Sequence, residues 1–547
     1  MSPHGRHEAR ASAHSFTSTV QTESTKPPPI PPARFWTLCV GVCLGLFLSM
    51  VDTSIVATSL YAIGTEFRDL NNVNWVALSY TLAYMGFAIV FSRISDITGR
   101  RDAFVVAYVV FVAFSLACGF AQNLAQLIAF RTLQGIGGSG LYSLSMIMLS
   151  ELSPAHLRQY IAAMIGLVVT TSGVLGPVLG GLLTSYTSWR WVFWINGPIG
   201  AASLATFVLG WPNRRYLPPH EKHSWKQLDY PGAFLTVAAA VLVVFSFQNA
   251  GQTTGTASHG SSWGSAVFIA PLAVGVVCWG ALMLWEYAVE NGLSRRFIPV
   301  LPLGIFRSVV YTSGVINTLL LGLPYLLLIY IVPLRIQIVG DKSALLAGVM
   351  LLPMLVAVAL GSIVSGAVNS KTPGITETLL AGSCLMLLGC GLSTTLSTQE
   401  LDSAKLLGFI ALCGMGFGLT VSSSTMIASI KVAPKHYAPA QGILAQLRIF
   451  GGSLGIAAST AILRTKTHRG LLPVGKRGSQ AHGSQSQLAK MTFAEAFRTD
   501  MMVATAVSGA AVMVALVAYW LRRNNQSAPD GRPQKKGRMT KTNDVEA

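Results

Sequence analysis

The sequence has little charge and few of the motifs that mark enzymes. Asp, Glu, Lys and Arg make up only 11% of the 547 residues, whereas 52% of the residues are hydrophobic. Soluble domains carry about 25% charged residues. No phosphate-binding loop and no dinucleotide-binding glycine motif in a strand-to-helix context occurs. We therefore expect a membrane protein with little soluble mass, which is not an enzyme and uses neither a cofactor nor ATP.

Cysteine is also scarce, and all seven cysteines lie within apolar runs, where they act as small core residues. Their spacing predicts neither a disulfide framework nor a metal site. The formal charge of +18 would suggest a nucleic-acid partner in a soluble protein. Here the basic residues lie mainly in the tails and in alternate loops, so membrane topology explains them better and we expect no nucleic acid.

Long apolar runs are what the sequence does contain. Fourteen of them are long enough to cross a bilayer, which takes about 20 residues each. This number predicts an all-α polytopic membrane protein with two six-helix halves and two helices inserted between them. The runs centre on residues 36–60, 73–92, 103–122, 124–149, 159–184, 190–211, 230–248, 264–287, 308–334, 344–368, 375–396, 405–430, 438–463 and 501–521.

Basic loops predict the orientation of these spans. The first half covers residues 36–211, the linker with the inserted pair 212–300, and the second half 301–521. Basic loops on one side share that side with the tails 1–35 and 522–547, so we place it in the cytosol and expect residues 1–35 to be disordered. Loop 464–500 is an exception, because it is basic and yet an even number of spans places it outside. The cytosolic loops contain Arg93, Arg100, Arg101, Arg214, Arg215, Lys222, Lys226, Arg295, Arg296, Arg307, Lys431 and Lys435.

The fifth predicted span, residues 166–184, reads GLVVTTSGVLGPVLGGLLT. Its small residues are expected to lie on one helical face, which would let another helix approach closely. Pro177 has no N–H to donate to the Gly173 carbonyl, so we expect a bend or a loosened turn there. The stripe comprises Gly166, Gly173, Gly176 and Gly180, and Gly181 follows it directly in the sequence.

Two charged residues are predicted to lie deep in the membrane. Asp52 in MVDTSIVATSL is the only acid that we place well inside a span, and such residues usually line a bundle interior or a water-filled path. Arg131 in IAFRTLQGIGGSG shares a helical stripe with Gln134 and Gly135. An intramembrane arginine needs a partner, for which Asp52 is the candidate. Asp52 either carries a proton or only holds helices together, and Arg131 either takes part in proton transfer or only satisfies backbone carbonyls.

Between the second and third spans lies SRISDITGRR, residues 92–101. Asp96 and Arg100 are four residues apart and can pair at a helix end, while Gly99 permits a sharp turn and Arg101 adds to the basic anchor. In SWRWVFWINGPIG, residues 188–200, we expect Trp189, Trp191 and Trp194 to lie in the interfacial aromatic belt and Asn196 to shape a helix start.

These motifs together resemble the fourteen-span drug:proton antiporters of the major facilitator superfamily. SGVLGPVLGG is similar to the GxxxGPxxGG antiporter motif, RTLQG to the fourth-span RxxQG motif, and SRISDITGRR to the cytosolic gating-loop motif with Ser92 in place of its leading glycine. The resemblance implies a monomeric exporter of small, mostly lipophilic compounds that exchanges them for protons by alternating access in the plasma membrane. Asp52 and Arg131 would then couple protons to transport.

Two residues of the thirteenth span, Gln441 and Arg448, share a face and remain open in role. Arg448 meets either an anionic substrate or a backbone carbonyl. Other functions also remain open: a proton symporter that imports siderophores or amino acids on the same fold, and a membrane sensor that transports nothing. The sequence does not identify the substrate.

Overall fold

The computed structural model describes residues 31–527 except for the gaps 70–72, 155–156, 214–215, 217–224, 251–263, 294–296, 298, 372–373, 399, 434–436 and 472–481. The predicted disorder of the N-terminal tail therefore lies outside the described residues, apart from its last few positions. The helices are α1 (Pro32–Glu66), α2 (Asn74–Thr98), α3 (Arg100–Gly119), α4 (Leu124–Glu151), α5 (Arg158–Tyr186), α6 (Trp191–Trp194), α7 (Asn196–Gly210), α8 (Tyr230–Asn249), α9 (Ala266–Ala288), α10 (Val309–Ile338), α11 (Ala344–Val349), α12 (Leu352–Lys371), α13 (Ile375–Ser393), α14 (Ser403–Lys431), α15 (Tyr437–Leu471) and α16 (His482–Ser527).

Each of the fourteen predicted runs coincides with one of these helices or with a consecutive pair, α6 with α7 and α11 with α12. Within the described part of the chain, 12 helices are long and apolar enough to cross a membrane, and the bent α2 raises that number to 13. The remaining helix, α4, carries Arg131 and Gln134 in the middle of its sequence, which lowers its apolar character. The all-α membrane fold is thus confirmed, and fourteen spans are consistent with it.

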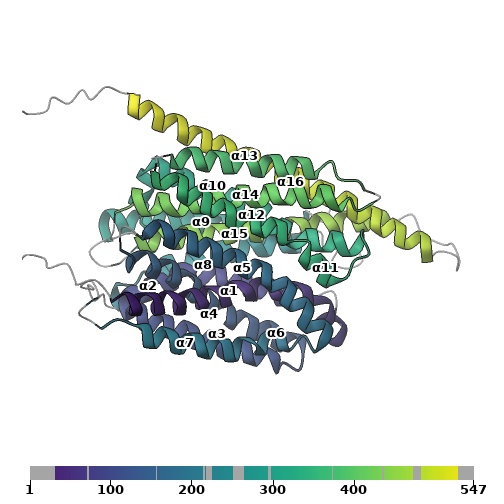
Figure 1. The fold of residues 1–547 in the computed structure, drawn as a ribbon, viewed down its shortest axis with the longest axis horizontal. Helices are drawn as coiled ribbons and strands as arrows, with labels where there is room; N and C mark the ends of the chain where they lie inside the picture. Colours follow the sequence, from purple (N-terminus) through teal and green to yellow (C-terminus); the bar gives the residue numbers. More distant parts are fainter. Residues whose placement is uncertain are drawn as a thin grey trace, which may run out of the picture.

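The helices form two groups that lie side by side (Figure 1). Helices α1–α7 pack mainly on one another, and so do α10–α16. Of the inserted pair, α8 packs on α2 and α15, and α9 packs on α8. The two groups meet where α5 contacts α12 and α14, and where α15 contacts α2 and α4. The predicted division into two six-helix halves with an inserted pair describes this packing.

The segment 464–500 is more helical than its description as a loop implies. Helix α15 continues to Leu471 and α16 already begins at His482, so α16 has 46 residues and extends beyond the bundle. At its inner turns Phe493, Phe497 and Met501 are buried against α10 and α13 in the core of the second half. These apolar contacts explain why the helix begins well before the predicted run 501–521.

Trp189 is buried within the protein, which differs from the exposed position expected of an interfacial tryptophan, whereas Trp191 is exposed. The Trp189 side chain is 3% exposed, and its indole N–H donates to the Glu66 carboxylate at 2.6 Å. Arg190 pairs with the same carboxylate at 2.7 Å. Desolvation raises the pKa of Glu66, but the hydrogen bonds from Trp189 and Arg190 outweigh it and lower that pKa overall. The end of α1 is therefore fastened to the start of α6.

Candidate functional site

The site is built around Asp52 of α1, which is fully buried. One carboxylate oxygen lies 2.5 Å from the guanidinium Nη1 of Arg131 on α4. The other accepts a hydrogen bond from the Gln134 amide at 3.0 Å. The same Arg131 nitrogen also donates to Gln134 Oε1 at 2.8 Å, and its Nε donates to the Val76 carbonyl at 3.2 Å. The structure thus brings together the acid, the arginine and the glutamine that the sequence singled out.

A fourth side chain, which the sequence did not assign to the site, completes this cluster. The Asn196 amide donates to the second Asp52 oxygen at 3.1 Å and to Ser115 Oγ at 2.9 Å. Asn196 opens α7 directly after the short α6, so the break between the two helices places it inside the bundle. A polar amide at the helix break in WINGPIG was the available clue. We refer to Asp52, Arg131, Gln134 and Asn196 as the carboxylate cluster.

The Arg131 side chain is also held by aromatic rings. Its guanidinium carbon lies 4.1 Å from the centre of the Tyr80 ring, and the Tyr80 hydroxyl donates to the Ser49 carbonyl at 3.2 Å. Gly135 allows this approach, because a side chain there would collide with the Tyr80 carbonyl. A positive charge over an aromatic face is stabilised by about 2 kcal/mol when desolvated. Arg131 therefore has a second set of contacts, independent of Asp52, that can hold its charge.

The statement that Asp52 is the only acid well inside a span is wrong. Glu286 of α9 and Asp500 of α16 are also fully buried, and both lie within candidate membrane spans. Asp500 accepts from Ser459 Oγ at 2.8 Å, and Glu286 accepts from the Leu301 backbone N–H at 2.9 Å. The sequence misled because both acids lie near the ends of their predicted apolar runs. Among the described residues, only Asp52 pairs with an arginine of another span at the centre of a half.

The glycine stripe of α5 contacts two helices rather than one. Side chains at Gly176 and Gly180 would collide with Ser54, Ile55 and Thr58 of α1, one turn beyond Asp52. On the other side, Gly166 faces Ser362 of α12, and Gly173 lies 3.5 Å from Leu355 when a Cβ is placed on it. Helix α5 runs unbroken through the buried Pro177, next to which Gly348 of α11 packs, and Gly181 is buried as well. Helix α5 therefore connects the helix of Asp52 to the second half.

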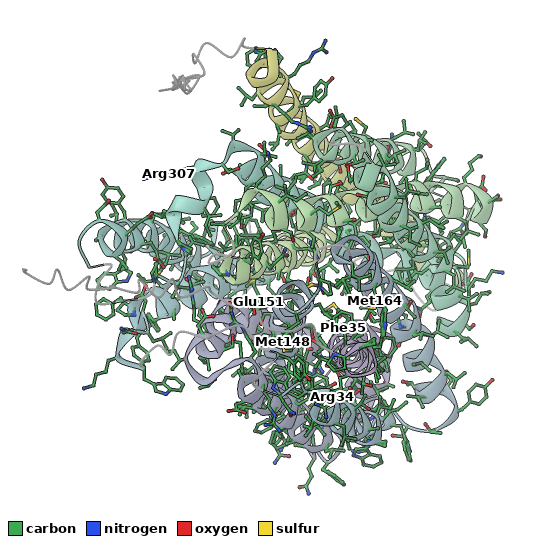
Figure 2. All side chains as sticks on the ribbon, turned by 60° about the vertical axis from the view of Figure 1, so that its left-hand side comes forward. Arg34, Phe35, Met148, Glu151, Met164 and Arg307 are labelled. Carbon is green, nitrogen blue, oxygen red and sulfur yellow. The ribbon has the colours of Figure 1, made fainter. Side chains whose placement is uncertain are left out.

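The gating loop forms a network of charges at the opposite end of α4. Asp96 pairs with Arg100 at 2.6 Å and with Arg93 at 3.2 Å. Arg100 also binds both oxygens of Glu151, at 2.9 and 3.1 Å. Gly99 has a φ of +96°, which glycine adopts without strain, and Arg101 is exposed. Figure 2 shows Glu151 and Met148 of α4 near Phe35 at the start of α1.

Glu151 was not expected from the sequence, and it extends the network to the helix of Arg131. The two residues are 20 positions apart on α4, which corresponds to about 30 Å of helix. A movement of α4 therefore displaces residues both of the carboxylate cluster and of the gating-loop network. In addition, the Arg93 guanidinium donates to the Pro299 carbonyl, which lies in the connection that precedes α10. The gating loop thus contacts the end of the linker that leads into the second half.

We expect the pair Arg100 and Glu151 to be energetically coupled. In a double-mutant cycle with Arg100→Gln and Glu151→Gln, the coupling in the free energy of unfolding should be about 1–2 kcal/mol, because the contact is bidentate and partly shielded from solvent. Denaturant unfolding of the detergent-solubilised protein measures it. Asp402 and Lys405 form an exposed control pair, for which we expect a smaller coupling. Equal coupling in both cycles would contradict a specific stabilising pair between Arg100 and Glu151.

The two remaining candidates of the thirteenth span differ in their contacts. The Gln441 amide donates to the Thr425 carbonyl at 3.2 Å and to Ser429 Oγ at 3.4 Å, so it joins α15 to α14. Arg448 donates from Nη1 to the Tyr142 hydroxyl on α4 at 3.0 Å. This is a contact between the halves, and it involves neither a carboxylate nor a backbone carbonyl. The sequence could not indicate Tyr142, because the partner depends on how the halves pack.

Comparisons with known proteins place the chain among membrane transporters. The chain is 32% identical over 440 residues to the MFS-type transporter FPY5 of Fusarium mangiferae, which covers 79% of this chain and 72% of that protein. It is 30% identical to Multidrug resistance protein 3 of Bacillus subtilis (strain 168), over 76% of this chain and 77% of that protein.

Solved structures share the fold at low sequence identity. A POT family peptide transporter superposes with a TM-score of 0.59 at 13% identity, over 92% of this chain and 99% of that chain. A bacterial homologue of the human lysosomal transporter Spinster gives a TM-score of 0.55 at 15% identity, over 91% of this chain and all of that chain. The family model of the Major Facilitator Superfamily matches residues 42–456. The chain therefore belongs to the Major Facilitator Superfamily, as a membrane transporter whose relatives include fungal efflux pumps and a bacterial multidrug resistance protein.

Proposed function

We propose that the protein exports small, mostly lipophilic compounds in exchange for protons, by alternating access between its two halves. The carboxylate cluster carries this proposal. A buried carboxylate with an arginine and two amide donors can be either charged and paired or protonated and released, and the two states differ in which helices it holds together. Efflux proteins among the relatives, such as the efflux pump LUC4 of a Fusarium species, support the direction of transport.

In the proposed cycle, Asp52 binds a proton when the site is open to the outside. The ion pair with Arg131 then breaks, and Arg131 keeps its contact with Tyr80. After reorientation the proton leaves to the cytosol and the pair forms again. Helix α5 transmits the change from α1 to α12, and the Arg100 network closes the opposite end. We place the protein in the plasma membrane as a monomer with both tails in the cytosol.

The test is the direction of proton movement in sealed vesicles that contain the purified protein. We expect a lipophilic compound that is added to one side to move protons the opposite way, by an amount that rises with the imposed pH gradient. Because the substrate is not identified, the test uses a panel of lipophilic cations, weak acids and neutral compounds. Proton movement in the same direction as the compound would support an importer instead. Vesicles without protein correct for leakage.

A further inference from the structure

Arg448 lies where the halves meet, and it has hydrogen-bond donors to spare. Its Nη1 donates to Tyr142, but its buried Nε has no acceptor in the part of the chain that the structure describes. Tyr142 accepts that bond, and its own hydroxyl hydrogen is given no acceptor by the described residues. The Tyr325 hydroxyl, on α10 one turn beyond the glycine that the Arg448 carbonyl contacts, also forms no hydrogen bond with them. A site with a charged guanidinium and free hydroxyl hydrogens suits a ligand that offers hydrogen-bond acceptors.

The charge of Arg448 lacks a counterion. Among the described residues no carboxylate lies within 4.0 Å of its guanidinium, whereas Arg131 has Asp52 and Arg100 has Asp96 and Glu151. An arginine stays charged in a protein, and such a charge within a span is costly unless it is paired. Its position is fixed, because the Arg448 carbonyl packs directly on Gly322 of α10. An anion from outside the protein can therefore supply the counterion that Arg448 lacks.

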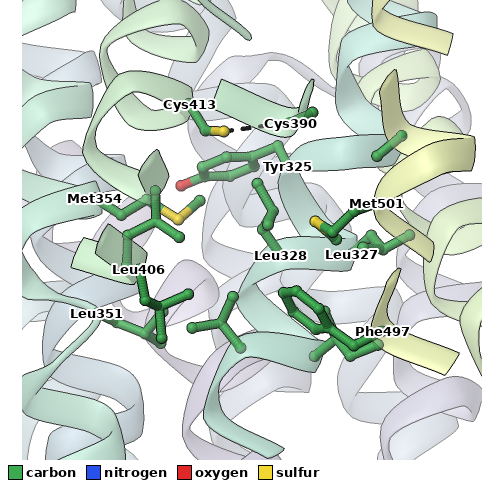
Figure 3. Close-up of a cluster of buried hydrophobic side chains, with 14 of the residues drawn as sticks. Tyr325, Leu327, Leu328, Leu351, Met354, Cys390, Leu406, Cys413, Phe497 and Met501 are labelled. Carbon is green, nitrogen blue, oxygen red and sulfur yellow. Dashed lines mark hydrogen bonds between the residues drawn. The ribbon is translucent and has the colours of Figure 1, made fainter. Parts of the chain in front are cut away.

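The core that begins beside Arg448 is aromatic and apolar, and it is buried in this state. Tyr325, one turn beyond Gly322 on α10, stacks on Phe417 of α14 with ring centres 3.5 Å apart and an angle of 6° between the planes. Figure 3 shows the Tyr325 hydroxyl on the side of Met354, with Leu328 and Met501 nearby. Of this cluster, the Tyr325 ring is the part that a ligand at Arg448 can contact once the halves move apart.

We propose that Arg448, with Tyr142 and Tyr325, binds the acidic group of an amphipathic organic acid, which is the exported compound. This deepens and rests on the proposed function. The anion displaces Tyr142 from Arg448 and so opens a contact between the halves. An anion that leaves the cytosol and a proton that enters both move positive charge inwards, so an inside-negative membrane drives both.

Equilibrium binding to the protein in nanodiscs tests this site without a proton gradient. The probes are anilinonaphthalene sulfonate and phenylnaphthylamine, two fluorescent compounds with the same rings, of which only the first carries an anionic group. We expect the full-length protein to bind the sulfonate about ten-fold more tightly than the neutral amine. Arg448→Gln should remove this preference and leave the affinity for the neutral amine nearly unchanged, and Arg448→Lys should keep part of the preference.

Arg335→Gln is the control, because it removes an arginine of α10 that lies ten residues, about 15 Å of helix, beyond Tyr325, and it should keep the preference. Equal affinity of the unmodified protein for both probes would overturn the proposal, and this comparison needs no variant to fold. A preference that disappears when phosphatidylglycerol replaces part of a phosphatidylcholine disc would assign the site to a lipid headgroup and also overturn it. The two proposals can fail separately. If the vesicles show no proton exchange but the preference for the sulfonate still depends on Arg448, proton antiport is refuted and the anion site is supported.

Discussion

Asp52→Asn is expected to reduce proton-driven transport by at least about 100-fold while substrate exchange without a gradient continues. Asparagine keeps the shape and can still accept a hydrogen bond from Arg131, but it cannot bind and release a proton. Coupling should therefore be lost, whereas reorientation with substrate on both sides needs no proton. Proton flux and counterflow of the same compound, measured in the same vesicles, separate the two steps.

The substitution also leaves the buried Arg131 without its charge partner, which costs about 3–5 kcal/mol when one member of a buried pair is removed. Asp52→Asn combined with Arg131→Gln removes both charges and tests coupling in a protein without that penalty. Asp52→Glu keeps a group that titrates and should retain partial coupling. The exposed Glu400→Gln makes the same chemical change on the surface and should have no effect. Normal proton coupling in the folded double variant would refute the role of Asp52.

The sequence predicted the pair of Asp52 and Arg131 because membrane burial leaves few choices. A charge in an apolar run must find an opposite charge, and the first half offered one obvious acid. It did not predict Asn196, because an amide can satisfy itself at a helix start and needs no distant partner. Nor did it predict Glu151, since an acid at the end of a span can equally well face water.

Contacts between the halves were the least predictable part. Tyr142 and Arg448 are separated by 306 positions, and their contact depends on the packing of α15 against α4. Periodicity shows which face of a helix is small or polar but not which helix faces it. This is why the glycines of α5 were expected to pack against one neighbouring helix, whereas they pack against both α1 and α12. It is also why the buried Asp500 escaped notice at the edge of its apolar run.

Gly180→Ala is expected to lower transport at least about ten-fold, whereas Gly173→Ala is expected to leave it nearly unchanged, since overpacking costs about 1–3 kcal/mol only where the neighbour cannot yield. The new methyl group at Gly180 would meet the backbone carbonyl of Ile55, which cannot move without α1. At Gly173 it would lie 3.5 Å from a flexible Leu355 methyl group, an ordinary contact. Both substitutions replace glycine by alanine within α5, so they raise its intrinsic helix propensity equally. The pair therefore isolates close packing from helix propensity.

The same comparison shows which neighbour of α5 matters for transport. Displacement of α1 would shift Asp52, which lies one turn from Ile55, relative to Arg131 on α4, so Gly180→Ala should impair proton coupling more than substrate binding. Transport assays and fluorescent-probe binding on the two variants measure these effects separately. If Gly173→Ala abolishes transport and Gly180→Ala does not, then the contact of α5 with α12 controls the cycle. In that case the glycines would act as a hinge between the halves, and the link from α5 to the carboxylate cluster would have to be abandoned.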